Sequence, residues 1–467
     1  MLTNLDFLQT GQPWPPKQTE ERARLIRYRD NRALFEGRHE LVFHEVFARL
    51  FRRDPNIKMS IEMVLGWPKR LSTLWADLLV GETPAVSDAG TESAQYVSDL
   101  VQRLDLWRRV YLAALDTSRY GNAVFKVRRD EKGVKVAVIP PACWFPVVSD
   151  TDAKEVAVHV LAWPTGDLSD GTGQLHVELH TSGHVEYRDY ARGGSPLTGN
   201  SGGNIGKLLS QTDEDTGVDA LVVPVSNLET SDAIYGHDDY SDLTSIIQEL
   251  EVRFAQLARI LDKHADPKMY GPDVTRVDEE TGLTVADLGD YIPMQDKTEV
   301  PPGYLVWNAQ TESSFKQIEM LMQQFYILSE TSPAVFGEIK SGLAESGSAL
   351  RRLLTVPLAK VNRVRGGFDA AVREVIRLAA LLDDGKKVAP VIAWKDGLPD
   401  DEAEMVPTEA VAVGAGITSK LSAMKRAYGY DDDQAEEELK RIAEEEPVLE
   451  DPASFAGQGK EEPDDDE

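Results

Sequence analysis

A histidine cluster with regular spacing is the strongest candidate for chemistry in this sequence. Three histidines recur at four-residue intervals beside two glutamates: His176, Glu178, His180, His184 and Glu186. On a helix this spacing would place three imidazoles on one face, which is a zinc-binding arrangement. The residues around them alternate between apolar and polar, and Ser182-Gly183 is typical of a turn, so we expect the histidines on the solvent face of a β-hairpin. A metal-dependent hydrolase is the alternative function, and we predict no metal site.

Three further motifs fail as catalytic sites. His44-Glu45 lacks the second histidine of a zincin motif, because position 48 is alanine. The glycine run Gly202–Lys207 has no Ser or Thr after its lysine, where a phosphate-binding loop needs a hydroxyl. Ser346 lacks the glycine two residues earlier that a nucleophile elbow requires, and helix capping explains it better. We therefore predict no catalytic residue and no cofactor, and a protein that is not an enzyme.

Length and composition indicate a multidomain globular protein. The 467 residues suggest about two to four domains, and 42% apolar with 28% charged residues are enough for real cores. Cys143 is the only cysteine, which excludes an internal disulfide. The N-terminus does not resemble a signal peptide and no apolar stretch is long enough for a membrane helix, so we expect neither secretion nor membrane insertion.

The charge distribution limits how the protein could bind nucleic acid. The formal net charge is −29, and residues Asp431–Glu467 carry nearly half of it. A protein that grips DNA needs a basic surface to neutralise phosphates, and this chain has none overall. An acidic wall repels phosphate, so we expect any DNA partner to move past the protein rather than to stay bound to it. The stretch Arg351–Arg377 is basic, opposite in sign to the chain as a whole.

Periodicity divides the chain into helical and β regions. Amphipathic helices are predicted at residues 20–35, 60–80 and 96–115, with a kink at Pro68. From 119 to 230 the period changes to two, which predicts a hairpin over 123–139 and strands near 156–163, 175–179 and 185–190. Within this region Gly193–Gly217 has the composition of a long exposed loop.

The second half is predicted to be mainly helical. Two long helices, 241–265 with Ser241 as its cap and one opening near Thr311, flank a small β-containing insert at 266–310. Their apolar stripes need partners that one hairpin cannot supply, which favours lateral neighbours. The next helix, Glu345–Leu382, is expected to bend at Pro357 and at Gly366-Gly367. Shorter helices are predicted near 408–413, 419–428 and 433–445.

In order and spacing these pieces resemble the portal proteins of long-tailed bacteriophages. Four patches carry the resemblance: Arg119–Val127 with its hairpin to Ile139-Pro140 and Phe145–Val147, Ile234–Tyr240 leading to His264–Lys268, Leu328–Gly337, and Glu345–Leu350. The resemblance covers residues 60–390, and the two ends of the chain contribute little to it.

The resemblance implies an α+β portal fold with a fixed layout. Residues 1–240 would form a wing of helices followed by a β region, 241–265 and 311–332 the two stem helices, and 266–310 a small α/β clip. Residues 333–403 would contain the tunnel loop, a long kinked tunnel helix and the return to the wing. Residues 404–446 would form a short helical crown and 447–467 an acidic disordered tail. The short crown and the acidic tail depart from the family pattern.

Two sets of residues are candidates for contact with DNA or with a neighbouring subunit. The tunnel loop that would face DNA consists of Glu338, Ile339, Lys340, Ser341, Gly342, Leu343, Ala344 and Glu345. The basic residues that would face the channel or pair between subunits are Arg351, Arg352, Lys360, Arg363 and Arg365. Either set would act electrostatically and without sequence specificity.

The function implied by the resemblance is that of a DNA conduit. The chain would form a dodecameric ring at one capsid vertex of a virion, assembled in the host cytoplasm, through which double-stranded DNA passes during packaging and ejection. Terminase, head-tail connector proteins, the major capsid protein and scaffold proteins would be its partners, and no membrane would be involved. A different ring-forming head-tail adaptor is a second alternative, although adaptors are usually much smaller.

Overall fold

The computed structural model describes residues 1–46, 64–89, 93–152, 154–166, 173–193, 203–265, 311–338, 352–395, 402–430 and 432–445. It also describes short stretches at 268–272, 276–277, 280, 284–285, 291–294 and 303–304. The architecture mixes helices and sheets, as predicted. The elements up to β16 (Pro390–Ala393) belong to one compact unit, and three C-terminal helices belong to a second.

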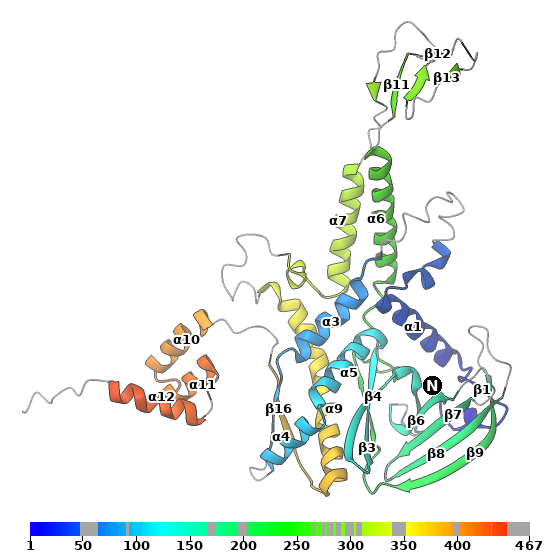
Figure 1. Cartoon of the computed structure of the whole chain (residues 1–467). Helices are drawn as coiled ribbons and strands as arrows, with labels where there is room; N and C mark the ends of the chain where they lie inside the picture. The colour runs from blue at the N-terminus through cyan, green and yellow to red at the C-terminus, as the bar shows by residue number, and fades with distance from the viewer. Residues whose placement is uncertain are drawn as a thin grey trace, which may run out of the picture. The chain divides into compact units, whose positions relative to one another are not determined.

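Two β-sheets lie at the centre of the first unit. The larger is antiparallel with the order β1-β9-β8-β7-β6-β5, and the smaller has the order β10-β3-β4. The larger sheet consists of β1 (Pro13–Trp14), β5 (Trp144–Val148), β6 (Val156–Thr165), β7 (Gln174–Thr181), β8 (His184–Gly193) and β9 (Gly203–Asp215). The smaller consists of β3 (Asn122–Asp130), β4 (Gly133–Ile139) and β10 (Val222–Ser226). Figure 1 shows both sheets close to the N-terminus.

The smaller sheet is covered on both faces, and the sequence of β3 reflects this. Ala123, Phe125 and Val127 are buried in the main core together with helices, whereas Val124 is buried with Trp144 of the larger sheet. Since successive side chains of a strand point to opposite faces, β3 separates a helical layer from a sheet layer. A strand buried on both faces tends to contain a continuous apolar run, and Ala123-Val124-Phe125 is such a run in β3.

Five helices accompany this central sheet layer: α1 (Thr19–Glu36), α3 (Trp67–Val80), α4 (Ala94–Arg103), α5 (Leu106–Tyr120) and α9 (Thr355–Asp384). Helices α5 and α9 pack on the smaller sheet, and α3 packs on α5. Their fully buried side chains include Leu71, Val110 and Phe368. The helices predicted for the N-terminal region are therefore present and face the core.

Two predicted helix boundaries in this region were wrong. The helix expected at 96–115 is two helices, α4 and α5, separated at Asp105, whose φ of 49° is left-handed. A left-handed residue cannot continue a right-handed helix, so the chain turns there. Pro68 does not kink a helix but lies in the first turn of α3, where its missing N–H has no intrahelical role.

The expected loop at Gly193–Gly217 was also wrong for most of its length. Residues Gly203–Asp215 form strand β9, which pairs with β8 over nearly its whole length. The side chains from Lys207 to Asp215 are exposed, so selection for burial does not act on them and the composition resembles that of a loop. Gly206 is needed here because a Cβ would lie 2.3 Å from the Ala191 carbonyl oxygen. Residues 194–202 lie outside the described residues.

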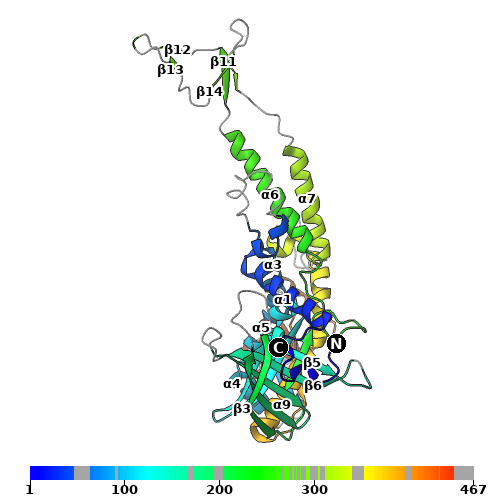
Figure 2. The ribbon, with the colours of Figure 1, turned by 90° about the vertical axis from the view of Figure 1, so that its right-hand side faces the viewer.

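The two long helices of the second half are present. Helix α6 (Thr244–Ala265) and helix α7 (Thr311–Leu328) run side by side in both views (Figures 1 and 2) and contact one another. The insert between them contains short strands, as expected: β11 (Met269–Pro272), β12 (Arg276–Val277), β13 (Thr284–Val285), β14 (Tyr291–Met294) and β15 (Gly303–Tyr304). Strand β11 pairs with β14 in parallel and with β15 antiparallel.

Helix α9 runs from Thr355 to Asp384 as one helix, which includes Pro357 and Gly366-Gly367, the positions at which bends were expected. Pro357 lies in the first turn of α9, where backbone N–H groups have no intrahelical acceptor. The missing N–H of proline therefore removes no hydrogen bond from the helix. Gly366 and Gly367 remain helical because tertiary packing outweighs their low helix propensity. Gly367 lies against β10, with Val225 Cγ2 at 3.7 Å from the position of a Cβ.

The second unit consists of α10 (Glu402–Gly414), α11 (Lys420–Tyr428) and α12 (Asp432–Glu445). These helices coincide with the predicted ones, except that α10 starts earlier and contains Pro407. Ser419 caps α11 by accepting a hydrogen bond from the Ser422 N–H at 3.1 Å. In the part of the chain that the structure describes, no helix is long and apolar enough to cross a membrane.

Candidate functional site at the base of the helical hairpin

The helical hairpin is held together by a narrow apolar interface. Leu250 and Leu257 of α6 and Ile318 of α7 are buried together, and Phe254, Leu321 and Met322 pack against them. These residues recur at three- and four-residue steps, which places them on one face of each helix. The periodicity seen in the sequence is therefore the interface between the two helices.

Other apolar side chains of α7 are exposed in the single chain. Phe315 is 49% exposed, Met320 60% and Ile327 65%. Exposed large apolar residues that follow one helix commonly mark a protein interaction surface. The hairpin therefore buries only part of its apolar surface in a single chain.

Asp238 organises the turn that leads into α6. Its carboxylate accepts hydrogen bonds from the backbone N–H groups of Tyr240 and Ser241, at 3.0 and 2.8 Å, and from the Ser241 hydroxyl. Arg27 Nε lies 3.1 Å from the same carboxylate. The expectation that Ser241 caps α6 was wrong, because its hydroxyl donates to Asp238 and the helix begins at Thr244.

Tyr240 fastens this turn to α3. The ring is fully buried, and its hydroxyl donates to the Pro68 carbonyl oxygen at 2.7 Å and lies 2.6 Å from Ser72 Oγ. Burial raises the pKa of Tyr240 well above its ordinary value, so the hydroxyl stays protonated. The base of α6 is therefore bonded to the main core rather than resting on its surface.

Lys360 of α9 forms a buried ion pair with Asp239 beside this turn. Lys360 Nζ lies 2.8 Å from Asp239 Oδ1, and the two side chains are 8% and 7% exposed. The same oxygen accepts a hydrogen bond of 2.8 Å from Asn227, and the ammonium lies 4.2 Å from the centroid of the Trp75 ring. The ammonium is thus compensated by a carboxylate and by an aromatic face, which are its two favourable partners in a low-dielectric site.

Glu330 connects the end of α7 to the same helix. Its carboxylate lies 2.5 Å from Arg363 Nη2 and 4.0 Å from Lys360 Nζ. Glu330 follows α7 in a left-handed conformation, with φ at 56°, which turns the chain toward α9. We call Asp239, Lys360, Glu330 and Arg363 the junction, because they link both ends of the hairpin base to α9.

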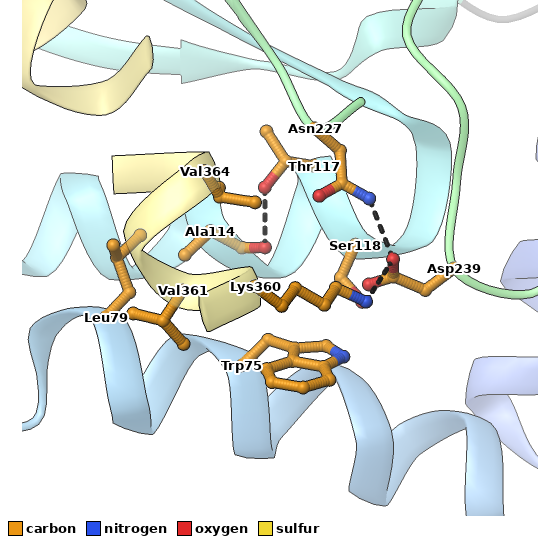
Figure 3. A pocket seen from close by; sticks show the side chains of 10 residues that line it. All are labelled: Trp75, Leu79, Ala114, Thr117, Ser118, Asn227, Asp239, Lys360, Val361 and Val364. Atoms are coloured by element: carbon orange, nitrogen blue, oxygen red, sulfur yellow. Dashed lines mark hydrogen bonds and ion pairs between the residues drawn. The ribbon is translucent and has the colours of Figure 1, made fainter. Parts of the chain in front are cut away.

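A small cavity borders the junction, and Figure 3 shows Lys360 reaching across it to Asp239. Its volume is about 20 Å³, and it is lined by Trp75, Leu79, Ala114, Thr117, Ser118, Asn227, Asp239, Lys360, Val361 and Val364. This volume matches about one water molecule and excludes an organic substrate. The arrangement pairs charges and fills space, and it does not place a nucleophile beside a base.

Only part of the predicted tunnel loop can be placed. Glu338 is exposed, and its N–H donates to the Pro333 carbonyl oxygen at 3.1 Å, whereas residues 339–345 lie outside the described residues. The segment before the loop is anchored by aromatic rings. Phe336 packs edge-on against Trp67 of α3 with centroids 5.5 Å apart, and Trp67 also contacts Phe325 of α7. The predicted loop thus follows directly from the junction.

The predicted basic residues separate into different environments. Lys360 and Arg363 are used within the chain by the junction, and Arg365 donates to the Lys395 carbonyl oxygen at 2.7 Å. Arg352 is exposed, and Arg351 lies outside the described residues. Sequence reasoning did not name the acidic partners, although Asp239 and Glu330 both lie in patches that carry the family resemblance.

Two of those patches meet beside the junction. Gly121 follows α5 with φ at 82°, and a Cβ there would lie 2.1 Å from the Gly236 carbonyl oxygen. Asn122 Oδ1 accepts a hydrogen bond of 2.9 Å from the Gly236 N–H. The two glycines and the asparagine therefore allow two backbones to touch, which explains why these residue types are required.

The histidine cluster lies on the expected hairpin, β7 and β8, but not on a solvent face. Glu178 and His180 are 3% and 1% exposed, because this face of β7 points at the smaller sheet. Lys126 of β3 lies 2.6 Å from Glu178 Oε1, and His180 Nε2 lies 2.9 Å from Glu178 Oε2. His184, at the turn, has a side chain that is 41% exposed.

The chemistry of this cluster is that of a buried ion pair. Burial alone would raise the pKa of Glu178, but hydrogen bonds with His176 and His180 and the charge of Lys126 lower it well below its ordinary value. Among the described residues, no group of three or more histidine, cysteine or acidic side chains is arranged to hold a metal ion. The geometry therefore does not favour the metal-dependent hydrolase.

The chain belongs to the phage portal protein family: the family model described as phage portal protein, SPP1 Gp6-like, matches residues 16–447. This family is structural and non-enzymatic, and its members are portal components of virions. The match includes the hairpin, the junction and α10 to α12. Among curated proteins, none matches the chain.

Several solved structures contain similar chains. One comes from the virion of a native gene transfer agent (GTA) particle, with 13% identity and a TM-score of 0.47, covering 91% of this chain and 96% of that chain. A second comes from the neck of an empty GTA particle computed with C6 symmetry, with 13% identity, a TM-score of 0.47, and coverage of 90% and 95%. A third, from the neck of a native GTA particle computed with C12 symmetry, has 14% identity, a TM-score of 0.41, and coverage of 77% and 89%.

Proposed function

We propose that this portal protein assembles into a closed ring of about twelve copies that conducts double-stranded DNA at one capsid vertex. Membership of the portal family supports the role, and the apolar surface of α7 supports the assembly. The proposed activity is passive: DNA enters during packaging and leaves during ejection, and another protein supplies the energy.

The observation that carries this proposal is the exposure of Met320 and Ile327, seven residues apart on one side of a helix that is already packed on its other face. A ring of identical subunits uses heterologous contacts, in which one surface of each copy meets a different surface of the next. A two-helix hairpin with apolar side chains on an inner and an outer face meets that requirement. We propose that α6 and α7 form the stem and that these side chains contact the neighbouring stem.

The remaining parts follow the family layout. We propose that residues 1–240 form the wing, 266–310 the clip, 333–403 the tunnel loop with α9 and the return to the wing, and α10 to α12 the crown. Residues 338–345 would touch DNA. The acidic character of the chain, with a net charge of −29, supports a wall that does not hold phosphates, so DNA slides without sequence-specific contact.

The partners follow from the same position. A portal at a capsid vertex would bind the terminase during packaging and head-tail connector proteins afterwards, and it would contact the major capsid protein and scaffold during assembly in the host cytoplasm. The junction contributes by holding both ends of the hairpin base against α9, so that the stem and the helix after the tunnel loop move together.

The experiment that tests the ring is electron microscopy of the purified full chain, with mass photometry of the same sample. The proposal expects a closed ring with an axial opening and a mass near twelve times 51.7 kDa. A chain that stays monomeric or dimeric at micromolar concentration, alone and with an added connector protein, contradicts it. A ring without an axial opening contradicts the conduit while leaving the assembly in place.

A further inference from the structure

Helix α1 buries polar as well as apolar side chains. The face that it buries against the molecule carries Arg24, Tyr28 and Asn31, which are 2%, 3% and 3% exposed. Arg24 donates to the carbonyl oxygens of Pro141 and Trp144, at 2.9 and 3.1 Å, and pairs with Glu21. Leu34 of the same helix is also buried, whereas Ile26 is left at the surface.

The outward face of α1 combines arginine and aliphatic residues. Leu25, Ile26 and Arg29 lie three, four and seven residues after Arg22, which places the four on one side of the helix. Ile26 is 42% exposed, and both arginines are exposed.

This face forms one wall of a hollow of about 530 Å³ beside the N-terminal edge of the larger sheet. The other wall is the segment Pro13–Lys17, which includes strand β1, and Asn204 of β9 completes the lining. Figure 1 shows α1 and β1 at this end of the molecule. The volume is in the range of sites that hold a ligand, and it far exceeds that of the cavity at the junction.

The charge of the hollow is opposite to that of the whole chain. Its charged lining residues are Lys17, Arg22 and Arg29, and no acidic side chain lines it. Arg29 is paired with the adjacent Asp30 at 2.8 Å, whereas Lys17 and Arg22 form no ion pair with any described residue. Electrostatic complementarity therefore selects a negatively charged occupant.

We propose that this hollow binds an extended acidic peptide segment of a partner protein, with apolar residues between its carboxylates. Arg22 and Arg29 are seven residues apart on a helix, which separates them by about 10 Å along its axis. In a polyproline II conformation, residues three apart lie on the same side and about 9 Å from each other. An acidic residue at every third position would therefore meet both arginines, while the residues between would cover Ile26 and Leu25.

A peptide is favoured over nucleic acid by the apolar lining. Phosphate contacts need only cations and N–H groups, whereas this hollow also presents Trp14, Pro15, Leu25 and Ile26. Proline and aromatic side chains are common in grooves that receive polyproline II segments. The inference does not depend on ring assembly or on DNA passage, because it concerns one subunit.

The test is fluorescence anisotropy with the full chain and the labelled peptide Gly-Glu-Pro-Leu-Glu-Pro-Leu-Glu-Gly. We expect saturable binding that the pair Arg22→Glu and Arg29→Glu weakens about tenfold or more, and that Ile26→Ser weakens about threefold. Arg108→Glu makes the same charge change at an exposed arginine of α5 and should leave the affinity unchanged. All these side chains are exposed, and circular dichroism of each variant verifies its fold.

Two further probes separate a peptide site from a nonspecific anion site. A peptide with Ser in place of Leu should bind several-fold more weakly, and so should a single-stranded oligonucleotide of equal charge. If the serine peptide and the oligonucleotide bind as well as the first peptide, the proposal is overturned in favour of a phosphate-binding surface. It is also overturned if the first peptide does not saturate below about 1 mM.

Discussion

Lys360 Nζ lies 2.8 Å from Asp239 Oδ1 although the two residues are 121 positions apart in the chain. One residue belongs to α9, and the other belongs to the turn that leads into α6. Because both side chains are more than nine-tenths buried, neither charge can turn to solvent if its partner is removed. The pair therefore fixes the position of the hairpin base relative to α9.

Replacing Lys360 by methionine should destabilise the fold by about 3–5 kcal/mol, because it leaves the Asp239 carboxylate buried without compensation. Urea denaturation followed by tryptophan fluorescence measures the change. Arg373→Met is the matched control on the same helix, where the arginine is 51% exposed and pairs with Asp369, and it should change stability by less than about 1 kcal/mol. Equal effects of the two substitutions would contradict the role of the junction.

Gly121→Ala should be far more damaging than Gly133→Ala. Both glycines have positive φ, but a Cβ at Gly121 would lie 2.1 Å from the Gly236 carbonyl oxygen, whereas Gly133 has open space around it. The conformational strain common to both costs about 1–2 kcal/mol, and the backbone clash adds to it only at Gly121. Thermal unfolding of the two variants separates strain from clash. Similar melting temperatures would show that the two backbones do not touch.

Stability should fall as the pH drops from about 6.5 to about 4. Burial, together with the neighbouring His180, lowers the pKa of His159 from 6.5 to about 4. In this pH range His159 binds a proton in the unfolded chain but not in the folded chain. The free energy of unfolding therefore falls by up to about 3 kcal/mol. Hydrogen bonds with Glu178 and Asp189 raise the pKa of His176, whose stabilisation is complete below about 6.5 and is lost only at higher pH.

The measurement is the free energy of unfolding at about pH 7 and about pH 4.5, for the natural chain and for His159→Gln. Glutamine keeps an acceptor for the Trp144 indole N–H, which lies 3.2 Å from His159 Nδ1. The variant should lose much less stability between the two pH values. The depressed pKa of Glu178 does not interfere, because its contribution is lost only below the ordinary glutamate range.

Met320→Ser combined with Ile327→Ser should prevent ring assembly without unfolding the chain. The two side chains are 60% and 65% exposed, so the monomer loses little by their removal. Mass photometry should show monomers, and circular dichroism should show an unchanged melting temperature. Val391→Ser, at a side chain that is 48% exposed on β16, is the control and should leave the rings intact.

Periodicity predicted the parts of this fold that bury one face. The apolar stripes of the two helices could be predicted because residues such as Leu250, Phe254 and Leu257 of α6 recur at helical steps. The partners of Lys360 could not be predicted from the sequence, because an ion pair between residues 121 positions apart leaves no local pattern. The patches of family resemblance did contain Asp239 and Glu330, but without geometry nothing connected them to α9.

Two errors concern whether a second layer covers one face of a strand. His176, Glu178 and His180 were expected in solvent because they alternate with apolar residues, yet Lys126 of the smaller sheet lies over them. In β9 the opposite occurs, since a strand at the edge of the sheet is exposed and polar enough to resemble a loop. Burial on the second face depends on the packing of distant segments, which local sequence does not record.

Because the hairpin is long, a small rotation at the junction produces a large displacement at the far end of the hairpin. Helix α6 has 22 residues, so it extends about 33 Å from the turn at Tyr240. A rotation of about 5° at that turn would displace the far end of the helix by about 3 Å, the width of a hydrogen bond. The contacts of Lys360 with Asp239 and Glu330 therefore limit the displacement of the far end of the hairpin.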